Sequence, residues 1–490
     1  MSAPALPYGF ARTQGVLVIA QDQDSAEILL REGADVNVVS EVRRHIGVPL
    51  RVVGSIGRSG FEARLAEMYG QGENDAAEVV QDLGQDVDIL KLMQELPAVE
   101  DLLDSQDDAP IIRLINALFT QAVHERASDI HVEPFEQHSI VRFRRDGMLR
   151  DVAQPHRGLH AAMSSRIKIM ASLDIAERRL PQDGRIALRI GNRAVDVRVS
   201  TIPTMHGERL VLRLLEKDAA RLQLAALGMP DDIRTALSEL LGRPHGIVLI
   251  TGPTGSGKTT TLYAALHTLD RKSRNIVTVE DPVEYDVAGV GQVQVNSRIE
   301  LSFARALRAI LRQDPDVIMI GEIRDLETAE IAVQASLTGH LVLATLHTND
   351  AAAAVTRLVD MGVESFLLAS SLRGVLAQRL VRCLCPLCKQ AKAANAADKA
   401  LLGAACPATL WSPVGCSKCN QTGYAGRTGV YELLLADDEL IKLIHDGASE
   451  ASLRAHGRKS GSRSLREDGI RLIADGTTSV EELLRVSGEA

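Results

Sequence analysis

A glycine-rich loop contains the residues of this chain whose types and spacing most directly indicate chemistry. An apolar run at 247–250 precedes the loop and a helical pattern at 260–266 follows it, which is the strand–loop–helix setting of a P-loop. Small residues let consecutive backbone N–H groups surround phosphate oxygens, while Lys258 can reach the β- and γ-phosphates and Thr259 can bind Mg²⁺. The predicted phosphate-binding residues are Gly252, Pro253, Thr254, Gly255, Ser256, Gly257, Lys258, Thr259 and Thr260.

Two later stretches would bring carboxylates to the same place. Residues 276–285 form a strand that ends in acidic residues, beginning with Glu280, and residues 314–322 form another that ends at Glu322. Because carboxylates at the carboxyl ends of strands lie on the ligand side of an open α/β sheet, both groups are expected beside the phosphates. Either could orient or deprotonate an attacking water molecule, or bind Mg²⁺ through water.

A third stretch, 338–350, has a histidine at each end of one apolar strand. A single histidine in such a strand is usually structural. His347, however, lies at the end where a side chain could sense the γ-phosphate. We therefore expect His347, ahead of His340, to belong to the site.

The six cysteines of the chain all lie between Cys383 and Cys419. Four of them form two C-x2-C pairs that are 27 residues apart, a longer gap than in common short zinc ribbons. Paired thiolates suit a tetrahedral Zn²⁺ site, and four thiolates leave no open position, so the zinc is expected to be structural. Cys383 and Cys406 belong to neither pair. The predicted zinc ligands are Cys385, Cys388, Cys416 and Cys419.

Composition limits the classes of function. Apolar residues make up 45% of the 490 residues, enough for several hydrophobic cores. A net charge of −9 and 3% aromatic residues give no overall reason to bind nucleic acid. No run of about 18 apolar residues predicts a membrane span, and the first residues do not have the pattern of a signal peptide. The expected location is therefore the cytoplasm.

The first part of the chain predicts a small domain and a linker. Residues 1–70 suggest an α/β unit with a strand at 16–19 and helices at 25–31 and 39–45, whose role is either scaffolding or docking. Residues 71–109 predict a solvated acidic linker, because the core of this stretch has twelve acidic residues and one basic residue.

Two further domains are expected after the linker. Residues 110–219 predict an α+β domain that begins with an amphipathic helix at 111–126. Residues 220–490 form the nucleotide domain, with a zinc element at 383–428, a helical segment at 390–402 inside it, and helices over 437–490. Arginines of the α+β domain either cover a solvated sheet face or include one or two that reach a nucleotide phosphate. They are Arg142, Arg144, Arg145, Arg178, Arg179, Arg185, Arg189, Arg198, Arg209 and Arg213.

Together these stretches resemble the secretion ATPase superfamily of type II secretion and type IV pili. The opening residues 6–11 and the chain length are most similar to its type II secretion class, the general secretory pathway protein E class. The matching motifs are the P-loop, residues 278–285, 321–325 and 338–350, the tetracysteine segment, and residues 127–134 and 206–209 of the second domain.

The resemblance implies a fold of class α/β. A RecA-like P-loop NTPase core would follow a small N-terminal α/β domain and an α+β (PAS-like) domain, and would carry a C-terminal tetracysteine zinc element and a helical tail. It also implies a homo-hexameric motor at the cytoplasmic face of the bacterial inner membrane, which uses ATP, Mg²⁺ and Zn²⁺ and powers pseudopilus assembly and protein export. The 1–70 domain would dock on the inner-membrane anchor, general secretory pathway protein L, and the inner-membrane platform protein is a further expected partner.

The resemblance also assigns roles within the site. Lys258 and Thr259 would hold phosphate and Mg²⁺. Glu280 is the first choice for activating water and Glu322 the second. Arg209, followed by Arg185, would contact the γ-phosphate as the second domain moves against the nucleotide domain.

Other functions stay open at this point. A type IV pilus assembly ATPase would share the same motifs. A nucleic-acid translocase would share the core, because fold does not settle function, but would need a basic groove with stacking aromatic residues. A scaffold that binds ATP without hydrolysing it would not need the carboxylates of Glu280 and Glu322.

Overall fold

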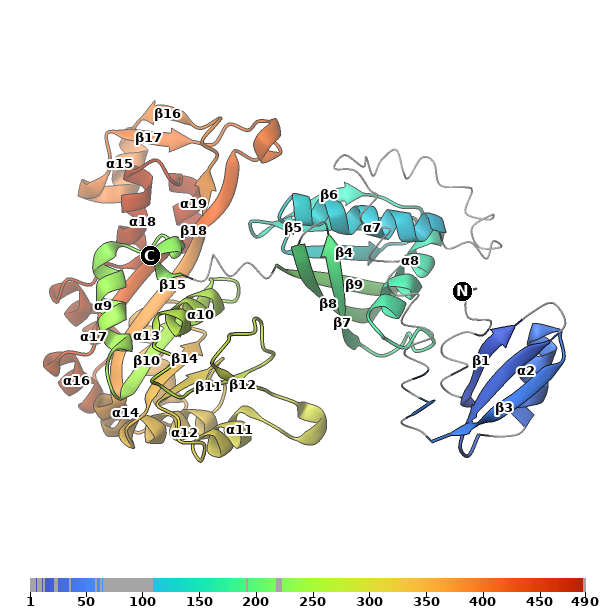
Figure 1. The fold of residues 1–490 in the computed structure, drawn as a ribbon. Coiled ribbons are helices and arrows are strands. Elements are labelled where there is room, and N and C mark those ends of the chain that lie inside the picture. The colour runs from blue at the N-terminus through green and yellow to red at the C-terminus, as the bar shows by residue number, and fades with distance from the viewer. Residues whose placement is uncertain are drawn as a thin grey trace. The chain divides into compact units, whose positions relative to one another are not determined.

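The computed structural model divides into two compact units, Met1–Glu216 and Lys217–Ala490 (Figure 1). It describes residues 6, 11, 14–21, 25–34, 37–57, 60, 61, 64, 109–190, 193–216 and 223–487. The predicted acidic linker, 71–109, lies outside the described residues except for its last residue. Among the residues described, no helix has both the length and the apolarity that crossing a bilayer requires.

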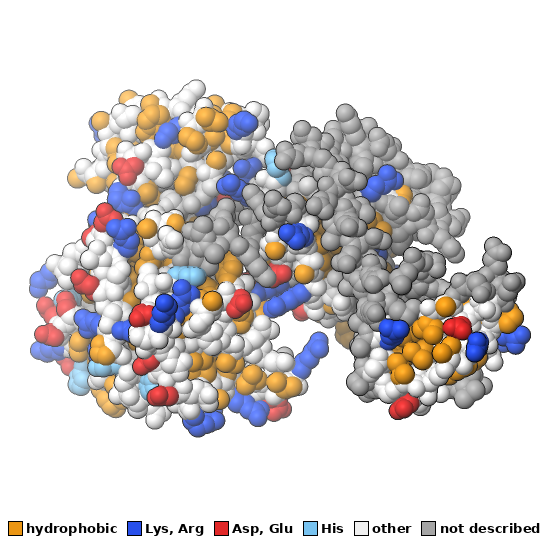
Figure 2. Space-filling model, in the orientation of Figure 1, with side chains coloured by type: hydrophobic (Ala, Val, Ile, Leu, Met, Phe, Trp, Pro, Cys, Tyr) orange, Lys and Arg blue, Asp and Glu red, His pale blue; other side chains and the backbone are white. Residues whose placement is uncertain are grey.

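The N-terminal domain has a three-stranded sheet in the order β1 (Val16–Gln21), β2 (Ala26–Arg31), β3 (Leu50–Ile56), with helix α2 (Asn37–Ile46) between β2 and β3. The helix predicted at 25–31 is wrong. That segment is β2, because Ala26 and Ile28 alternate into the core and pair with β1 and β3. β3 is an edge strand with Val52 and Val53 about half exposed, and hydrophobic side chains gather on the face of this domain seen in Figure 2.

The second domain is a six-stranded antiparallel sheet with two helices, as the α+β prediction requires. Leu114 and Leu118 of the first helix, Met163 of the second helix and Ile130 of the sheet share one buried core. The sheet order is β6-β5-β4-β9-β8-β7. The elements are α7 (Ala109–His124), β4 (Asp129–Pro134), β5 (Ser139–Arg145), β6 (Met148–Ala153), α8 (Arg157–Met170), β7 (Gln182–Ile190), β8 (Arg193–Thr204) and β9 (Gly207–Glu216).

The unit Lys217–Ala490 is built on a seven-stranded sheet in the order β12-β11-β13-β14-β10-β15-β18, parallel except for the edge strand β18. All residues of β10, β13 and β14 are buried, since helices cover both faces. The strands are β10 (Gly246–Thr251), β11 (Ile276–Glu280), β12 (Gly291–Gln294), β13 (Val317–Ile320), β14 (Leu341–Leu346), β15 (Leu372–Leu384) and β18 (Tyr424–Leu435).

Alternate residues of β10 enter two different cores. Ile247 and Leu249 pack with α11 to α14, whereas Val248 and Ile250 pack with α9 and α10 on the other face. The P-loop strand is thereby held between two helical layers. The helices are α9 (Asp231–Leu241), α10 (Lys258–Thr268), α11 (Phe303–Ile310), α12 (Leu326–Leu337), α13 (Ala351–Asp360) and α14 (Ser365–Ser371).

The tetracysteine element is inserted between β15 and β18. The helix predicted at 390–402 is only partly correct, because Gln390–Ala393 is strand β16, paired with β17 (Thr409–Ser412), and the helix α15 spans only Ala396–Leu402. The predicted helical tail is present. Its helices are α16 (Asp438–His445), α17 (Glu450–Lys459), α18 (Leu465–Ala474) and α19 (Val480–Ser487).

Candidate active site

The P-loop joins β10 to α10 with a backbone that requires glycine. Gly255 and Gly257 have φ of 80° and 88°, in the left-handed region that glycine adopts without strain. Gly257 directly precedes the first residue of α10. The backbone N–H groups at the start of this helix are therefore available to an anion, as expected for a phosphate site.

The neighbouring strand β15 fixes the shape of this loop. The Gln378 side chain donates a hydrogen bond from Nε2 to the carbonyl oxygen of Ser256 (2.9 Å) and accepts one from Thr261 Oγ1 (2.7 Å). A Cβ on Gly252 would lie 2.3 Å from the Gln378 carbonyl oxygen, and one on Gly257 would lie 2.7 Å from Gln378 Nε2. Close contact with β15 is thus a second reason for glycine at both positions.

Lys258 is held inside the loop. Its Nζ donates hydrogen bonds to the carbonyl oxygens of Gly252 (2.7 Å) and Pro253 (3.1 Å). Burial lowers the pKa of Lys258 to about 8, although the charge of Glu322 acts in the opposite direction. The lysine is therefore close to where phosphates would lie, and an anion there would favour its charged form.

His347 connects Lys258 to Glu322. Its Nδ1 lies 3.5 Å from Lys258 Nζ, and its Nε2 lies 3.3 Å from Glu322 Oε2. The ring can thus accept from the lysine and donate to the carboxylate. Glu322 also contacts Arg324, whose guanidinium lies 4.0 Å from Asp281. Three predicted site residues from separate segments therefore come together.

Glu280, at the end of β11, has a different environment. Its side chain is buried and receives hydrogen bonds from Thr278 Oγ1 (2.6 Å) and Gln292 Nε2 (3.0 Å) on Oε1. The Tyr263 hydroxyl donates to Oε2. Glu280 is consequently enclosed by donors, whereas the carboxylate of Glu322 faces two partly exposed basic side chains.

Lys258, His347, Glu322 and Glu280 border one cavity of about 360 Å³. Residues 254–260 of the predicted P-loop set line it, while Gly252 and Pro253 bind Lys258 instead. Thr259, the predicted Mg²⁺ ligand, is among the lining residues, as are Glu280, Glu322 and His347. Sequence reasoning missed Leu380 and Arg427, which reach this cavity from β15 and β18.

Arg209 and Arg185 lie in the other unit, on β9 and β7. Arg209 Nη2 pairs with Glu133 Oε1 at 2.6 Å. Glu133 is buried and also contacts Arg142, so one carboxylate holds two arginines of this sheet. Arg209, the first of the two candidates, is therefore ordered by a buried counter-charge within its own domain.

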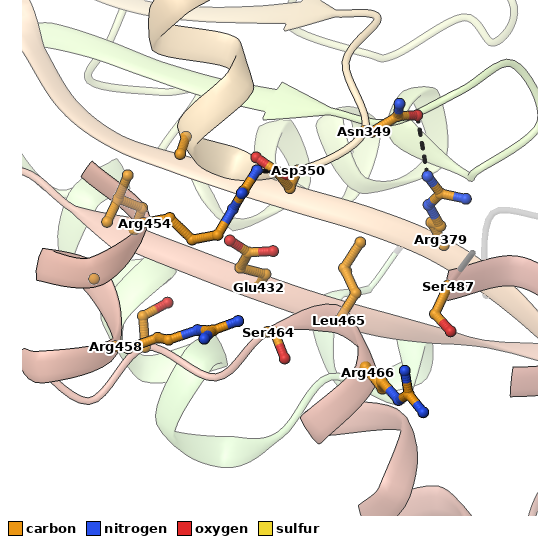
Figure 3. Close-up of a pocket in the computed structure, with 14 residues that line it drawn as sticks. Asn349, Asp350, Arg379, Glu432, Arg454, Arg458, Ser464, Leu465, Arg466 and Ser487 are labelled. Atoms are coloured by element: carbon orange, nitrogen blue, oxygen red, sulfur yellow. Dashed lines mark hydrogen bonds and ion pairs between the residues drawn. The ribbon is translucent and has the colours of Figure 1, made fainter. Parts of the chain in front are cut away.

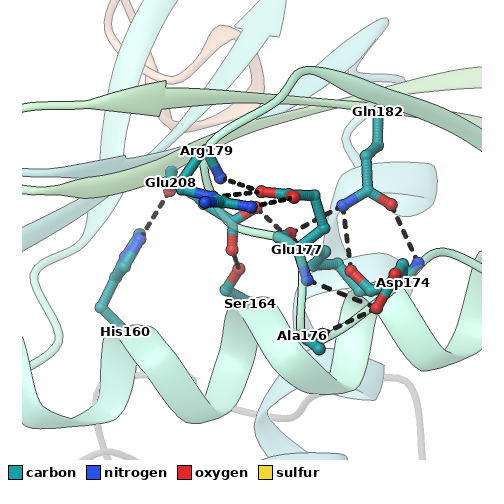
Figure 4. Close-up of polar contacts among 9 residues, drawn as sticks. His160, Ser164, Asp174, Ala176, Glu177, Arg179, Gln182 and Glu208 are labelled. Carbon is teal, nitrogen blue, oxygen red and sulfur yellow. Dashed lines mark hydrogen bonds and ion pairs between the residues drawn. The ribbon is translucent and has the colours of Figure 1, made fainter.

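The residue next to Arg209 holds the opposite side of this domain together. Glu208 accepts hydrogen bonds from Lys168 Nζ (2.7 Å) and Ser164 Oγ (3.3 Å) of α8, and its carbonyl oxygen lies 2.7 Å from His160 Nε2 (Figure 4). Lys168 also donates to the carbonyl oxygen of Glu177, in the loop that leads to β7. Glu208 therefore has a structural role that ties α8 and this loop to β9.

The four predicted zinc ligands form one cluster. Their sulfur atoms all lie within 4.8 Å of one another, and the pairs Cys385–Cys416, Cys388–Cys419 and Cys416–Cys419 are 3.9, 3.8 and 3.7 Å apart. A tetrahedral site with Zn–S bonds of about 2.3 Å places its sulfurs about 3.8 Å apart. Backbone N–H groups of Gly415 and Gly423 point at two of the sulfurs, as suits thiolates. The donor set therefore fits Zn²⁺.

A second cavity, of about 290 Å³, is lined by Asn349, which lies two residues after His347 in the chain. Arg379 donates to Asn349 Oδ1 (3.1 Å), and Arg454 of α17 pairs with Asp350 (2.7 Å) (Figure 3). Glu432 of β18 lines the same cavity, and burial followed by the charge of Asp350 raises its pKa to about 7. The histidine strand is thus tied to the C-terminal helices.

Comparison with known proteins covers nearly the whole chain. The Type II/IV secretion system protein family matches residues 104–485, and a domain family of GSPII protein E matches residues 5–69. The chain is 58% identical to the type II secretion system protein HxcR of Pseudomonas aeruginosa over 99% of each chain. It is 53% identical to the type II secretion system ATPase E of Vibrio cholerae, over 99% of this chain and 97% of that relative.

Solved structures agree with this fold. The pilus retraction motor PilT with bound ADP is 26% identical, with a TM-score of 0.53, and the match covers 76% of this chain and 96% of PilT. The Legionella pneumophila ATPase DotB, 21% identical with a TM-score of 0.57, shares the fold over 76% of this chain and 95% of its own. From these matches, the chain belongs to the Type II/IV secretion system protein family.

Proposed function

We propose that this chain is a motor that hydrolyses ATP to power pseudopilus assembly and protein export in type II secretion. The observation that carries the proposal is the convergence of Lys258, His347 and Glu322 on the cavity formed by the P-loop. Both relatives are named for type II secretion, which supports that system as the one this motor serves. An ATPase of type IV pilus assembly is the weaker alternative, because the pilus motor is only 26% identical.

In this proposal the P-loop amides and Lys258 bind the phosphates of ATP, and Thr259 binds Mg²⁺, which supplies charge neutralisation when bound. An incoming phosphate would replace the carbonyl oxygens that Lys258 now contacts. His347, beside Lys258, is then placed to detect the γ-phosphate. Arg209 and Arg185 of the second domain are the candidates for reaching the nucleotide at a subunit boundary.

We infer that Glu322 activates the attacking water and that Glu280 has a positioning role, the reverse of the order favoured by the sequence. The side chains of Tyr263, Thr278 and Gln292 donate hydrogen bonds to the Glu280 carboxylate and leave it little freedom to move. The partners of Glu322 are Arg324 and His347, with side chains 61% and 45% exposed, so bound nucleotide could displace them. A carboxylate that is freed in this way can accept a proton from water.

The experiment that tests this assignment compares two isosteric variants. Glu322→Gln should bind ATP with the affinity of the parent protein and release no phosphate. Glu280→Gln should keep measurable turnover at a reduced rate. Full activity of Glu322→Gln would contradict the assignment and return the role to Glu280.

We place the motor as a homo-hexamer at the cytoplasmic face of the inner membrane, with Zn²⁺ in a structural role in the tetracysteine cluster. The N-terminal domain would dock on general secretory pathway protein L, and the exposed Val52 and Val53 of β3 suit such a contact. The inner-membrane platform protein is the other expected partner. Val53→Glu in the full chain should weaken binding to the cytoplasmic part of protein L, and unchanged binding would exclude this edge.

A further inference from the structure

The hydroxyl of Tyr263 is the centre of a hydrogen-bond cluster at the wall of the nucleotide cavity. Tyr263 lies on α10, five residues after Lys258, and its side chain is fully buried. The hydroxyl donates to Glu280 Oε2 and accepts from the backbone N–H groups of Glu284 and Tyr285, each at 3.2 Å, and a further donor, Gln292 Nε2, lies 3.3 Å from it. One donor and two acceptor positions are all that a phenol offers, so the group is saturated.

The same hydroxyl is therefore hydrogen-bonded to two parts of the cavity wall. One is the carboxylate of Glu280, which lines the cavity. Three of about four acceptor positions of this carboxylate are used by Tyr263, Thr278 and Gln292. One position is left for a further donor, such as a water molecule beside the phosphates.

The other part is the loop after β11. Asp281, Pro282 and Glu284 of this loop line the cavity. The Tyr285 ring packs edge-on against Tyr263, with centroids 5.2 Å apart and planes at 81°. Gln292 closes the arrangement by donating to the Tyr285 carbonyl oxygen at 2.9 Å.

No local feature of the sequence explains why a phenol, rather than an apolar side chain, is buried here. A buried hydroxyl next to a carboxylate is costly unless its hydrogen bonds are made. Burial, followed by the hydrogen bond to Glu280, raises the pKa of Tyr263, so the hydroxyl stays a donor. The buried hydroxyl of Tyr263 thus lies where it joins the P-loop helix α10 to a loop that lines the cavity.

We propose that Tyr263 is a positioning residue for ATP hydrolysis, whose hydroxyl holds Glu280 and the loop 281–285 in place against the P-loop helix. The inference rests on the proposed function of this cavity. It assigns Tyr263 to the turnover step and not to nucleotide affinity, since its hydroxyl acts on Glu280 and the loop 281–285 and not on the phosphate-binding amides.

The test is Tyr263→Phe in the full-length protein, which keeps the ring and removes only the hydroxyl. The kcat for ATP should fall about ten-fold, while the Kd for ATP stays within about two-fold of the parent value. Tyr431→Phe is the matched control, because Tyr431 is equally buried, donates to the carbonyl oxygen of Leu227 at 2.9 Å, and is not among the residues that line the cavity. It should leave kcat unchanged.

Hydrogen–deuterium exchange separates this proposal from the function on which it rests, because it needs no turnover. Amides of Glu284 and Tyr285 lose their acceptor in Tyr263→Phe, so a peptide spanning 281–290 should exchange at least ten-fold faster, and should not in Tyr431→Phe. Unchanged exchange together with unchanged kcat would overturn the proposal. A parent protein without ATPase activity would instead refute the proposed function, and the exchange result would still decide whether Tyr263 holds the loop.

Discussion

Gln378 on β15 donates a hydrogen bond to the carbonyl oxygen of Ser256 inside the P-loop, although the two residues are 122 positions apart. With Thr261 bonded to the same side chain, Gln378 links the loop and the helix that follows it. The phosphate-binding loop is therefore held in shape by a strand that continues into the tetracysteine element.

Replacing Gln378 with leucine should weaken ATP binding. The change removes the partners of the Ser256 carbonyl and the Thr261 hydroxyl, so the free loop loses its shape and ATP binding has to restore it, at a cost of about 1–2 kcal/mol, or roughly ten-fold in Kd. Titration with a fluorescent ATP analogue measures the effect. Gln334→Leu, at an exposed position on α12, is the control. Equal affinities of the two variants would show that Gln378 does not shape the loop.

Binding of ATP should be accompanied by proton uptake near pH 8. The lowered pKa of Lys258, about 8, means that about half of the lysines are neutral at that pH, and nearby phosphates restore the charged form. Calorimetry in buffers of different ionisation enthalpy should show uptake of about half a proton at pH 8 and almost none at pH 6.5. Uptake that is the same at both pH values would contradict this description of Lys258.

Several features of this site could be predicted from the sequence and others could not. Lys258, His347 and Glu322 each end or begin a recognisable strand or loop, so the parallel sheet brings them to one edge. Leu380 and Arg427 reach the same cavity from strands β15 and β18, whose pairing depends on distant contacts, and no local pattern indicates them. The segment that forms β2 shows the same limit, because its apolar residues fit both periods: Ala26, Ile28 and Leu30 have strand spacing, and Ala26, Leu29 and Leu30 have helical spacing.

Cys385→Ser should remove bound zinc. Metal analysis of the parent protein should find one zinc per chain, and the variant should have lost it, because three thiolates cannot complete the tetrahedral site. The variant should also be cleaved faster by protease within residues 383–428. Cys406→Ser changes a cysteine outside the cluster and should keep the metal. A parent protein without zinc would end this assignment.

Glu432→Gln should stabilise the protein at alkaline pH. Because the folded-state pKa of about 7 exceeds the usual 4.5, the folded state binds more protons between these values, and the free energy of unfolding falls as pH rises from about 4.5 to about 7. Above pH 7 the buried charge of Glu432 lowers the free energy of unfolding by about 3 kcal/mol. Glutamine keeps an acceptor and carries no charge. The thermal unfolding midpoint of Glu432→Gln should therefore exceed that of the parent protein at pH 8 and match it near pH 5.

The control for this comparison is Glu330→Gln, at an exposed position on α12. It should leave the midpoint unchanged at both pH values. An advantage of Glu432→Gln that is as large at pH 5 as at pH 8 would show that shape, and not charge, determines the effect.

Release of inorganic phosphate from ATP is the most direct test of the motor. The purified full-length chain, supplied with Mg²⁺, its membrane anchor and lipid, should release phosphate continuously, and Lys258→Ala should release none and bind ATP weakly. No release by the parent protein, or release by Lys258→Ala at the parent rate, would contradict the account.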